Sequence, residues 1–184
     1  LGHLALKGIS LEINSGEILG MAGVSGNGQP ELTDVLSGLR TPTQGLYLFD
    51  GVHVENPTVS EMIDLGVGYI PEDRKKYGVS SGMSIASNFF MRDFRNPQFT
   101  SNQLLNLSNI IDYGHNKMEE FDIRAPSEKT PVGLLSGGNM QKVILARECS
   151  RPLKLLLACQ PTRGLDIHAT SFIRNQICLL YTSP

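Results

Sequence analysis

The chain has 184 residues, of which 40% are hydrophobic and 18% are charged, a composition that favours a packed core over disorder and fits about one domain with an insertion. Sixteen basic and 18 acidic residues give a net charge of −2, which argues against a basic nucleic-acid surface covering the molecule. No apolar run approaches the roughly 18 residues of a membrane helix, and the three widely spaced cysteines indicate neither a disulfide framework nor a zinc site.

The first half of the chain alternates short predicted strands with helices. Period-two alternation and short apolar runs predict the strands, and apolar residues on one face predict the helices. Asp50-Gly51, flanked by strand-like residues, predicts a two-residue hairpin turn. Strands are expected at 4–13, 17–22, 45–49, 52–54 and 67–70, and helices at 30–39 and 60–65.

The middle section, 83–127, loses the strand pattern and predicts a helical subdomain inserted in a core formed by 1–82 and 128–184. Strands that alternate with helices predict an α/β core with a mainly parallel sheet and an N-terminal antiparallel part. Because the strand pattern is already under way at the first residue and the final helix stops near the last, we expect a fragment truncated at both ends. Further helices are expected at 103–111, 139–148 and 168–180, and a buried strand at 153–158.

A glycine-rich loop lies between the strand predicted at 17–22 and the helix predicted at 30–39, where a phosphate-binding loop would lie. Its residues are Gly23, Val24, Ser25, Gly26, Asn27, Gly28, Gln29 and Pro30. Glycines allow successive N–H groups to converge on an anion at a helix start. The spacing fits G-x-x-x-x-G-K-[ST] except that Gln29 replaces the lysine and Pro30 the hydroxyl residue, so an ordinary strand–turn–helix bend is the alternative.

A second loop opens the helix predicted at 139–148. Ser136 is a good N-cap, so simple helix capping explains it, yet Ser-Gly-Gly also leaves helix-terminal N–H groups available to an anion. The loop and the residues that follow it are Leu135, Ser136, Gly137, Gly138, Asn139 and Gln141.

Four segments in this order resemble the nucleotide-binding domain of an ABC transporter, a P-loop NTPase-like ATPase. They read GVSGNGQP, YIPEDRKKYG, LSGGNMQK and QPTRGLD. The last three look most like the second ATP-binding half of the sugar and nucleoside importer ATPases, in which two such halves are fused. The resemblance covers about 7–177.

The resemblance implies a role for each segment. Residues 23–30 would face a nucleotide, Glu72 stands at the Q-loop position, 135–139 form the signature loop, and the D-loop comprises Gly164, Leu165 and Asp166. Where the family has Asp-Glu for Mg²⁺ and the attacking water, this chain has Cys159 and Gln160. His168 is too close to the D-loop to be the switch histidine. With no intact catalytic residue and no metal ligand of its own, the chain alone is predicted not to hydrolyse ATP.

Domains of this family pair head-to-tail, so the resemblance implies two kinds of partner. One is another ABC nucleotide-binding domain, whose ATP and Mg²⁺ the intact signature loop would complete, and the other is a set of transmembrane permease subunits at the cytoplasmic face of the membrane. No nucleic-acid partner is expected. The alternatives are a non-hydrolysing nucleotide-binding or regulatory domain and a soluble ABC protein acting on nucleic acid.

Several residues near these motifs carry two interpretations. Arg74-Lys75-Lys76 is predicted to be a solvated turn, with docking to a membrane subunit as the alternative. Arg163 belongs to the family pattern but equally predicts a surface ion pair. The run 89–91 could contact a membrane subunit, whereas core packing is predicted for at least one of its residues.

Overall fold

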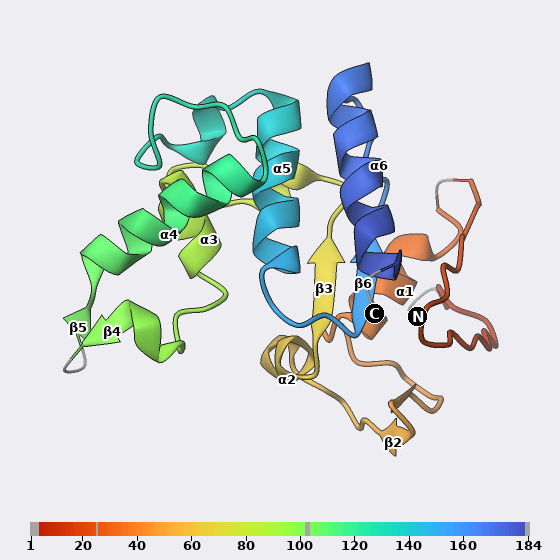
Figure 1. Cartoon of the computed structure of the whole chain (residues 1–184). Coiled ribbons are helices and arrows are strands. Elements are labelled where there is room, and N and C mark those ends of the chain that lie inside the picture. Colours follow the sequence, from red (N-terminus) through yellow and green to blue (C-terminus); the bar gives the residue numbers. More distant parts are fainter. Residues whose placement is uncertain (1–3, 25, 102–103, 183–184) are drawn as a thin grey trace. The chain divides into compact units, whose positions relative to one another are not determined.

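The computed structural model describes residues 4–24, 26–101 and 104–182 (Figure 1). The chain forms two compact units. The first contains the residues up to Tyr69, the segment Leu153–Leu157 and the residues from Tyr181, and the second contains Ile70–Pro152 and Ala158–Leu180. The predicted subdomain boundaries, 83 and 127, both lie inside the second unit, so that subdomain stays a prediction.

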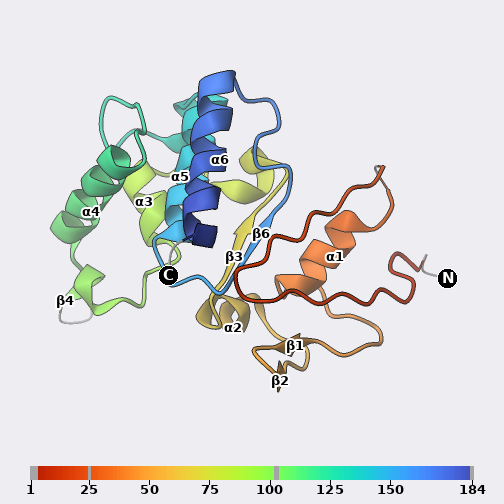
Figure 2. The same cartoon turned by 45° about the vertical axis from the view of Figure 1, so that its right-hand side comes forward.

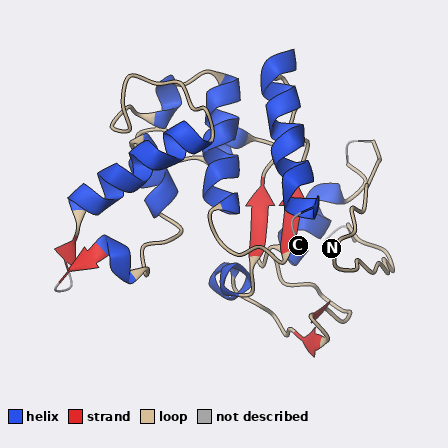
Figure 3. Cartoon of the chain, viewed as in Figure 1, coloured by secondary structure: helices blue, strands red, loops and turns tan. Residues whose placement is uncertain are grey.

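The first unit contains most of a short parallel sheet, whose last residues, Ile70 and Ala158, belong to the second unit. Strands β3 and β6 pair with each other, and Lys154 N donates to Gly66 O at 2.9 Å. Cys159 N likewise donates to Ile70 O at 2.9 Å, so residue numbers rise together along both strands. The elements are α1 (Gln29–Leu36), β1 (Leu48–Phe49), β2 (Val52–His53), α2 (Val59–Asp64), β3 (Val67–Ile70) and β6 (Leu155–Ala158) (Figure 3).

The hairpin prediction is confirmed, and its turn explains it. Strands β1 and β2 are antiparallel, with Phe49 opposite Val52. Asp50 and Gly51 both have positive φ, 55° and 76°, as the type I′ turn of a two-residue hairpin requires.

Helix α2 begins at a capping box. Thr58 accepts from Glu61 N, and the Glu61 carboxylate accepts from Thr58 N at 2.7 Å. The hydrogen bonds that this carboxylate accepts from Thr58 N and from Thr58 Oγ1 lower the pKa of Glu61. Apolar side chains from α1, α2, β3 and β6 then close one core; they are Leu36, Met62, Val67 and Leu157.

Helix α1 ends earlier than expected. The prediction extended it to 39, but it stops at Leu36 because the next residues form a Schellman motif. Leu39 N donates to Asp34 O at 2.8 Å and Gly38 N to Val35 O at 3.2 Å. Gly38 has φ of 76°, a conformation that glycine adopts without strain.

The strands predicted at 4–13 and 17–22 are absent, and both predictions were wrong. These residues form no helix or strand, and Ile18, at 64% exposed, is not buried. Alternation describes where side chains point, whereas a strand needs a neighbouring strand for its backbone hydrogen bonds. The described residues supply no such neighbour to either segment; Figure 2 shows this stretch as coil.

The second unit is mostly helical. Its elements are η1 (Arg74–Gly78), α3 (Ile85–Phe90), η2 (Pro97–Phe99), β4 (Thr100–Ser101), β5 (Leu104–Leu105), α4 (Leu107–Glu120), η3 (Val132–Leu134), α5 (Gly137–Cys149) and α6 (Ile167–Thr182). Helix α4 begins after the predicted start at 103, which lies outside the described residues, and extends nine residues past the predicted end at 111. None of the helices within the described ranges is long and apolar enough to cross a bilayer.

Aromatic rings join α3 to α4 and η2. Phe99 packs edge-on against Phe90 and Tyr113, with ring centroids 5.5 and 5.1 Å apart. Phe89 is 1% exposed, so core packing is confirmed for this member of the 89–91 run.

Candidate functional site

Two glycines of the glycine-rich loop in the first unit adopt the left-handed backbone conformation. Gly26 and Gly28 have φ of 90° and 93°. Gly28 is the N-cap of α1, and a Cβ there would lie 2.8 Å from Ala5 O, so only glycine fits. Ser25 lies outside the described residues, while Val24, Gly26 and Asn27 are exposed.

The side chain of Gln29 occupies the place where the motif has a lysine. Its amide lies directly against Gly23, because a Cβ built on Gly23 would be only 2.1 Å from Gln29 Nε2. Gln29 Oε1 is buried and has no hydrogen-bond partner among the residues that the structure describes. A neutral amide can give a phosphate at most a neutral hydrogen bond, whereas a lysine ammonium gives a stronger, charge-assisted one. Pro30 follows, and it supplies neither a hydroxyl nor an N–H group.

The residues after β6 do not fit a magnesium site. Mg²⁺ is held by carboxylate and hydroxyl oxygens. Cys159 is half-buried and directly follows the strand, and Gln160 has a positive φ of 46°. No group of three or more His, Cys, Asp or Glu side chains that could hold a metal occurs within the described ranges. Cys159 and Gln160 therefore offer no carboxylate to a Mg²⁺ ion.

The signature loop in the second unit presents a capped helix tip. Ser136 Oγ accepts from Asn139 N and from Asn139 Nδ2, each at 3.3 Å, which confirms Ser136 as the N-cap of α5. Ser136 and Gly137 are exposed, and Gly138 is half-buried. The N–H groups of Gly137 and Gly138 donate to no acceptor in the described part of the chain, so they remain available to an anion.

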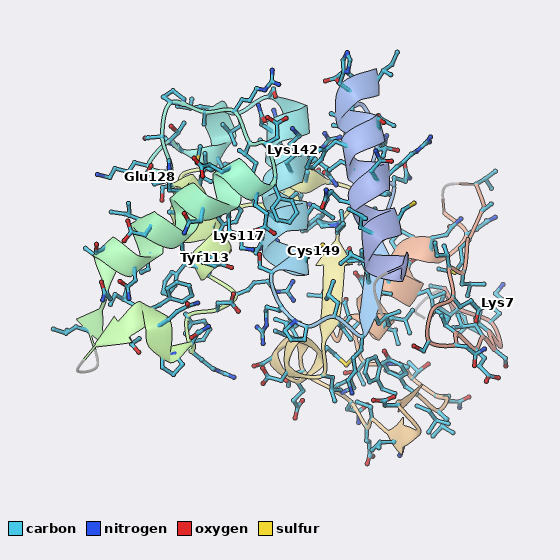
Figure 4. All side chains as sticks on the ribbon, in the orientation of Figure 1. Lys7, Tyr113, Lys117, Glu128, Lys142 and Cys149 are labelled. Atoms are coloured by element: carbon cyan, nitrogen blue, oxygen red, sulfur yellow. The ribbon has the colours of Figure 1, made fainter. Side chains whose placement is uncertain are left out.

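Other residues of this loop face inward. Gln141 is 2% exposed within α5, and Leu135 is half-buried at the end of η3. Lys142, one residue further on and labelled in Figure 4, anchors α5 to the preceding segment. Its Nζ donates to Asp122 O at 2.6 Å and to Asp122 Oδ2 at 2.7 Å. Lys142 Nζ also lies 4.4 Å from the ring centre of Phe172 on α6.

Asp166 of the D-loop caps the start of α6. Asp166 Oδ1 accepts from Ala169 N at 2.8 Å and Asp166 O accepts from Thr170 N at 2.9 Å. The bond from Ala169 N lowers the pKa of Asp166. A Cβ on Gly138 would lie 3.0 Å from Ala169 Cβ and 3.8 Å from Asp166 Oδ2. The structure thus brings the signature loop and the D-loop together within the second unit.

Arg74 joins these two loops, a role that the predicted solvated turn did not anticipate. Its Nη1 donates to Gly137 O at 3.1 Å and its Nη2 donates to Arg163 O. Lys75 and Lys76 are exposed, as a solvated turn implies. The prediction was therefore wrong for Arg74 alone.

Glu72, at the Q-loop position, pairs with the side chain of Arg163, so the surface ion pair predicted for Arg163 is confirmed. Residues 23–30 belong to the first unit, whereas Glu72, the signature loop and the D-loop belong to the second. The structure thus unites the predicted residues in two sets, each within its own unit.

Comparison with known proteins identifies the family. The ABC transporter family model matches residues 6–163. The chain is 44% identical over 178 residues to a glucose import ATP-binding protein of Haloferax volcanii, covering 96% of this chain and 32% of that protein. It is 36% identical over 176 residues to a guanosine import ATP-binding protein of Bacillus subtilis, with 96% and 34% covered. The chain thus spans about a third of these curated relatives.

The fold agrees with that result. A dimeric ATP-binding cassette, solved in a post-hydrolysis state with ADP and Pi, superposes with a TM-score of 0.79 at 20% identity, covering 97% of this chain and 75% of that one. The α/β class with a parallel sheet, antiparallel strands and helices, predicted from the sequence, is confirmed. From its motifs, its fold and the match over most of its length, the chain belongs to the ABC transporter family.

Proposed function

We propose that this chain is a nucleotide-binding domain of an importer for a sugar or a nucleoside. The relatives named for glucose and guanosine import support this solute class. In this proposal the domain works at the cytoplasmic face of the membrane, together with transmembrane permease subunits and a second nucleotide-binding domain.

Within that pair, the signature loop of this chain completes the ATP site of the second domain. One contrast supports this assignment. At the tip of α5, the N–H groups of Gly137 and Gly138 have no acceptor among the described residues, whereas the chain's glycine-rich loop holds the neutral Gln29. The tip of α5 carries the positive end of the helix dipole, which favours a phosphate.

The chain's own loop contributes no hydrolysis in this proposal. Phosphoryl transfer depends on charge neutralisation and on a positioned water. Gln29, Cys159 and Gln160 provide neither a cation nor a carboxylate. Removal of one group that stabilises the transition state raises the activation free energy by about 3–4 kcal/mol. The loss of both the cation and the carboxylates therefore leaves this site inactive.

The test pairs this chain with a second ABC nucleotide-binding domain that keeps the loop lysine and both acids. Ser136→Arg puts a bulky side chain on the tip of α5, and we expect phosphate release to fall at least about tenfold. Ser108→Arg is the matched control, because Ser108 is exposed on α4 of the same unit, and it should leave the rate unchanged.

Two results would contradict the proposal. One is an undiminished rate in the Ser136→Arg pair, and the other is steady phosphate release by this chain alone. Tight nucleotide binding without turnover in the pair would favour the non-hydrolysing alternative instead. An importer component should also co-purify with permease subunits, which a soluble nucleic-acid protein would not do.

A further inference from the structure

We propose that Arg74 is a positioning residue that holds the signature loop and the D-loop in one arrangement, so that both address the nucleotide of the second domain together. This inference rests on the proposed function. It concerns a side chain that touches neither the nucleotide nor the reacting atoms.

The backbone around Arg74 is fixed from its N-terminal side. Asp73 caps η1: its Oδ1 accepts from Lys75 N at 3.1 Å and from Lys76 N at 3.0 Å. At the other end of η1, a Cβ on Gly78 would lie 2.4 Å from Ile144 Cδ1 of α5. The short helix is therefore anchored against α5, and the Arg74 side chain starts from a defined position.

The guanidinium then reaches two backbone carbonyls that are distant in sequence. Gly137 O, 63 residues away, accepts from Nη1, and Arg163 O, 89 residues away, accepts from Nη2. A guanidinium presents several N–H donors in a rigid plane, so it can bridge two acceptors, whereas a lysine ammonium acts as a single point charge. The two acceptors belong to the first turn of α5 and to the residue before the D-loop.

The glycines of both loops leave room for this bridge. A Cβ on Gly137 would lie 3.1 Å from Arg74 Nη1, and one on Gly164 would lie 3.7 Å from Arg74 Nη2. Gly164 also has φ of 64°. A second connection runs in the opposite direction, because the Arg163 side chain pairs with Glu72. Two arginines thus link the segment around residue 73 to the segment around residue 164.

The geometry has a consequence that distinguishes ATP from ADP. The signature loop, in the proposed function, meets the terminal phosphate of the second domain's ATP, which ADP lacks. Loss of the bridge should therefore weaken the use of ATP and leave ADP binding almost unchanged. A general loss of folded protein would reduce the measured rate without separating the two nucleotides.

The experiment uses the same pair of domains with Arg74→Met, Arg74→Lys and the control Lys75→Ala, since Lys75 is an exposed neighbour. We expect Arg74→Met to raise the ATP concentration for half-maximal hydrolysis about tenfold, in line with the loss of charged hydrogen bonds. The ADP concentration for half-maximal inhibition should stay within about twofold of the wild-type value. Arg74→Lys should recover little, because one ammonium cannot reproduce the bridge.

A second measurement needs no partner. Hydrogen exchange of the chain alone should become faster in peptides 136–141 and 160–166 for Arg74→Met and stay unchanged for Lys75→Ala. Unchanged exchange in both peptides, or equal losses for ATP and ADP, would overturn the positioning role. If Ser136→Arg has no effect but exchange at both peptides accelerates, the positioning role stands and the proposed function fails. Thermal unfolding of each variant identifies any that does not fold.

Discussion

Gly138 of the signature loop should not accept a methyl group without a loss of stability. Its ideal Cβ would lie 3.0 Å from Ala169 Cβ on α6, whereas carbon atoms pack best at about 3.5–4.0 Å. Ala169 Cβ belongs to a short side chain that has no rotamer in which to move away. Gly138→Ala therefore requires α5 and α6 to separate by about 0.5–1 Å.

Two opposing effects set the change in the free energy of unfolding of Gly138→Ala. Overpacking of this kind costs about 1–3 kcal/mol, and the better helix propensity of alanine returns up to about 1 kcal/mol. The net loss is about 1 kcal/mol, which in a chain of 184 residues lowers the melting temperature by about 2–4 °C. Gly82→Ala is the matched control, because a Cβ on Gly82 would have no described atom within 4 Å.

Thermal unfolding followed by circular dichroism measures both variants. We expect Gly138→Ala to melt below the wild type and Gly82→Ala to melt within about 1 °C of it. Ala169→Gly should reduce the loss of stability when combined with Gly138→Ala. A melting temperature for Gly138→Ala at or above that of the wild type would refute the close approach of α5 and α6.

Three further predictions test the rest of the chain. Gln29→Lys should raise the affinity of the chain's own loop for ATP at least about tenfold, as titration calorimetry can measure, because an ammonium forms charge-assisted bonds to phosphate; phosphate release should still be absent, since Cys159 and Gln160 remain. Lys142→Met should lower the melting temperature by about 2–4 °C at pH 7 through the lost bonds to Asp122. Lys142 lowers the pKa of Asp122. The stability that this pair contributes is therefore present above the unfolded pKa of about 4, and it disappears as the pH falls through the lower folded pKa. The difference in melting temperature between variant and wild type should shrink below about pH 4, and a constant difference would contradict the assignment. Burial raises the pKa of the Cys149 thiol to about 12, so mass spectrometry should find Cys149 unmodified by iodoacetamide at pH 8 in the folded chain and alkylated in urea.

Elements that depend on neighbours in sequence could be predicted. Asp50-Gly51 specifies a type I′ turn by itself, and Ser136 specifies the start of α5 because capping involves residues at most three positions apart. The early end of α1 had such a local signal too. Gly38 is a typical C′ glycine, and the expected helix extended past it.

The remaining features depend on contacts that leave no local pattern. Whether 4–13 forms a strand depends on a partner strand elsewhere, which alternation does not reveal. The bridge of Arg74 ends on the carbonyl oxygens of Gly137 and Arg163. Every residue has a backbone carbonyl, so side-chain identity gives no indication that these two are the acceptors. The motif order nevertheless indicated the family, since loops built for phosphate have distinctive glycine spacing.

The cap of α5 also decides which part of one hydroxyl is left for a ligand. Ser136 Oγ accepts from both Asn139 N and Asn139 Nδ2, so its acceptor capacity is used within the loop and its O–H is left as a donor. Such a group can donate to an oxyanion. Threonine would preserve this polarity, whereas aspartate would cap the helix equally well and present negative charge instead.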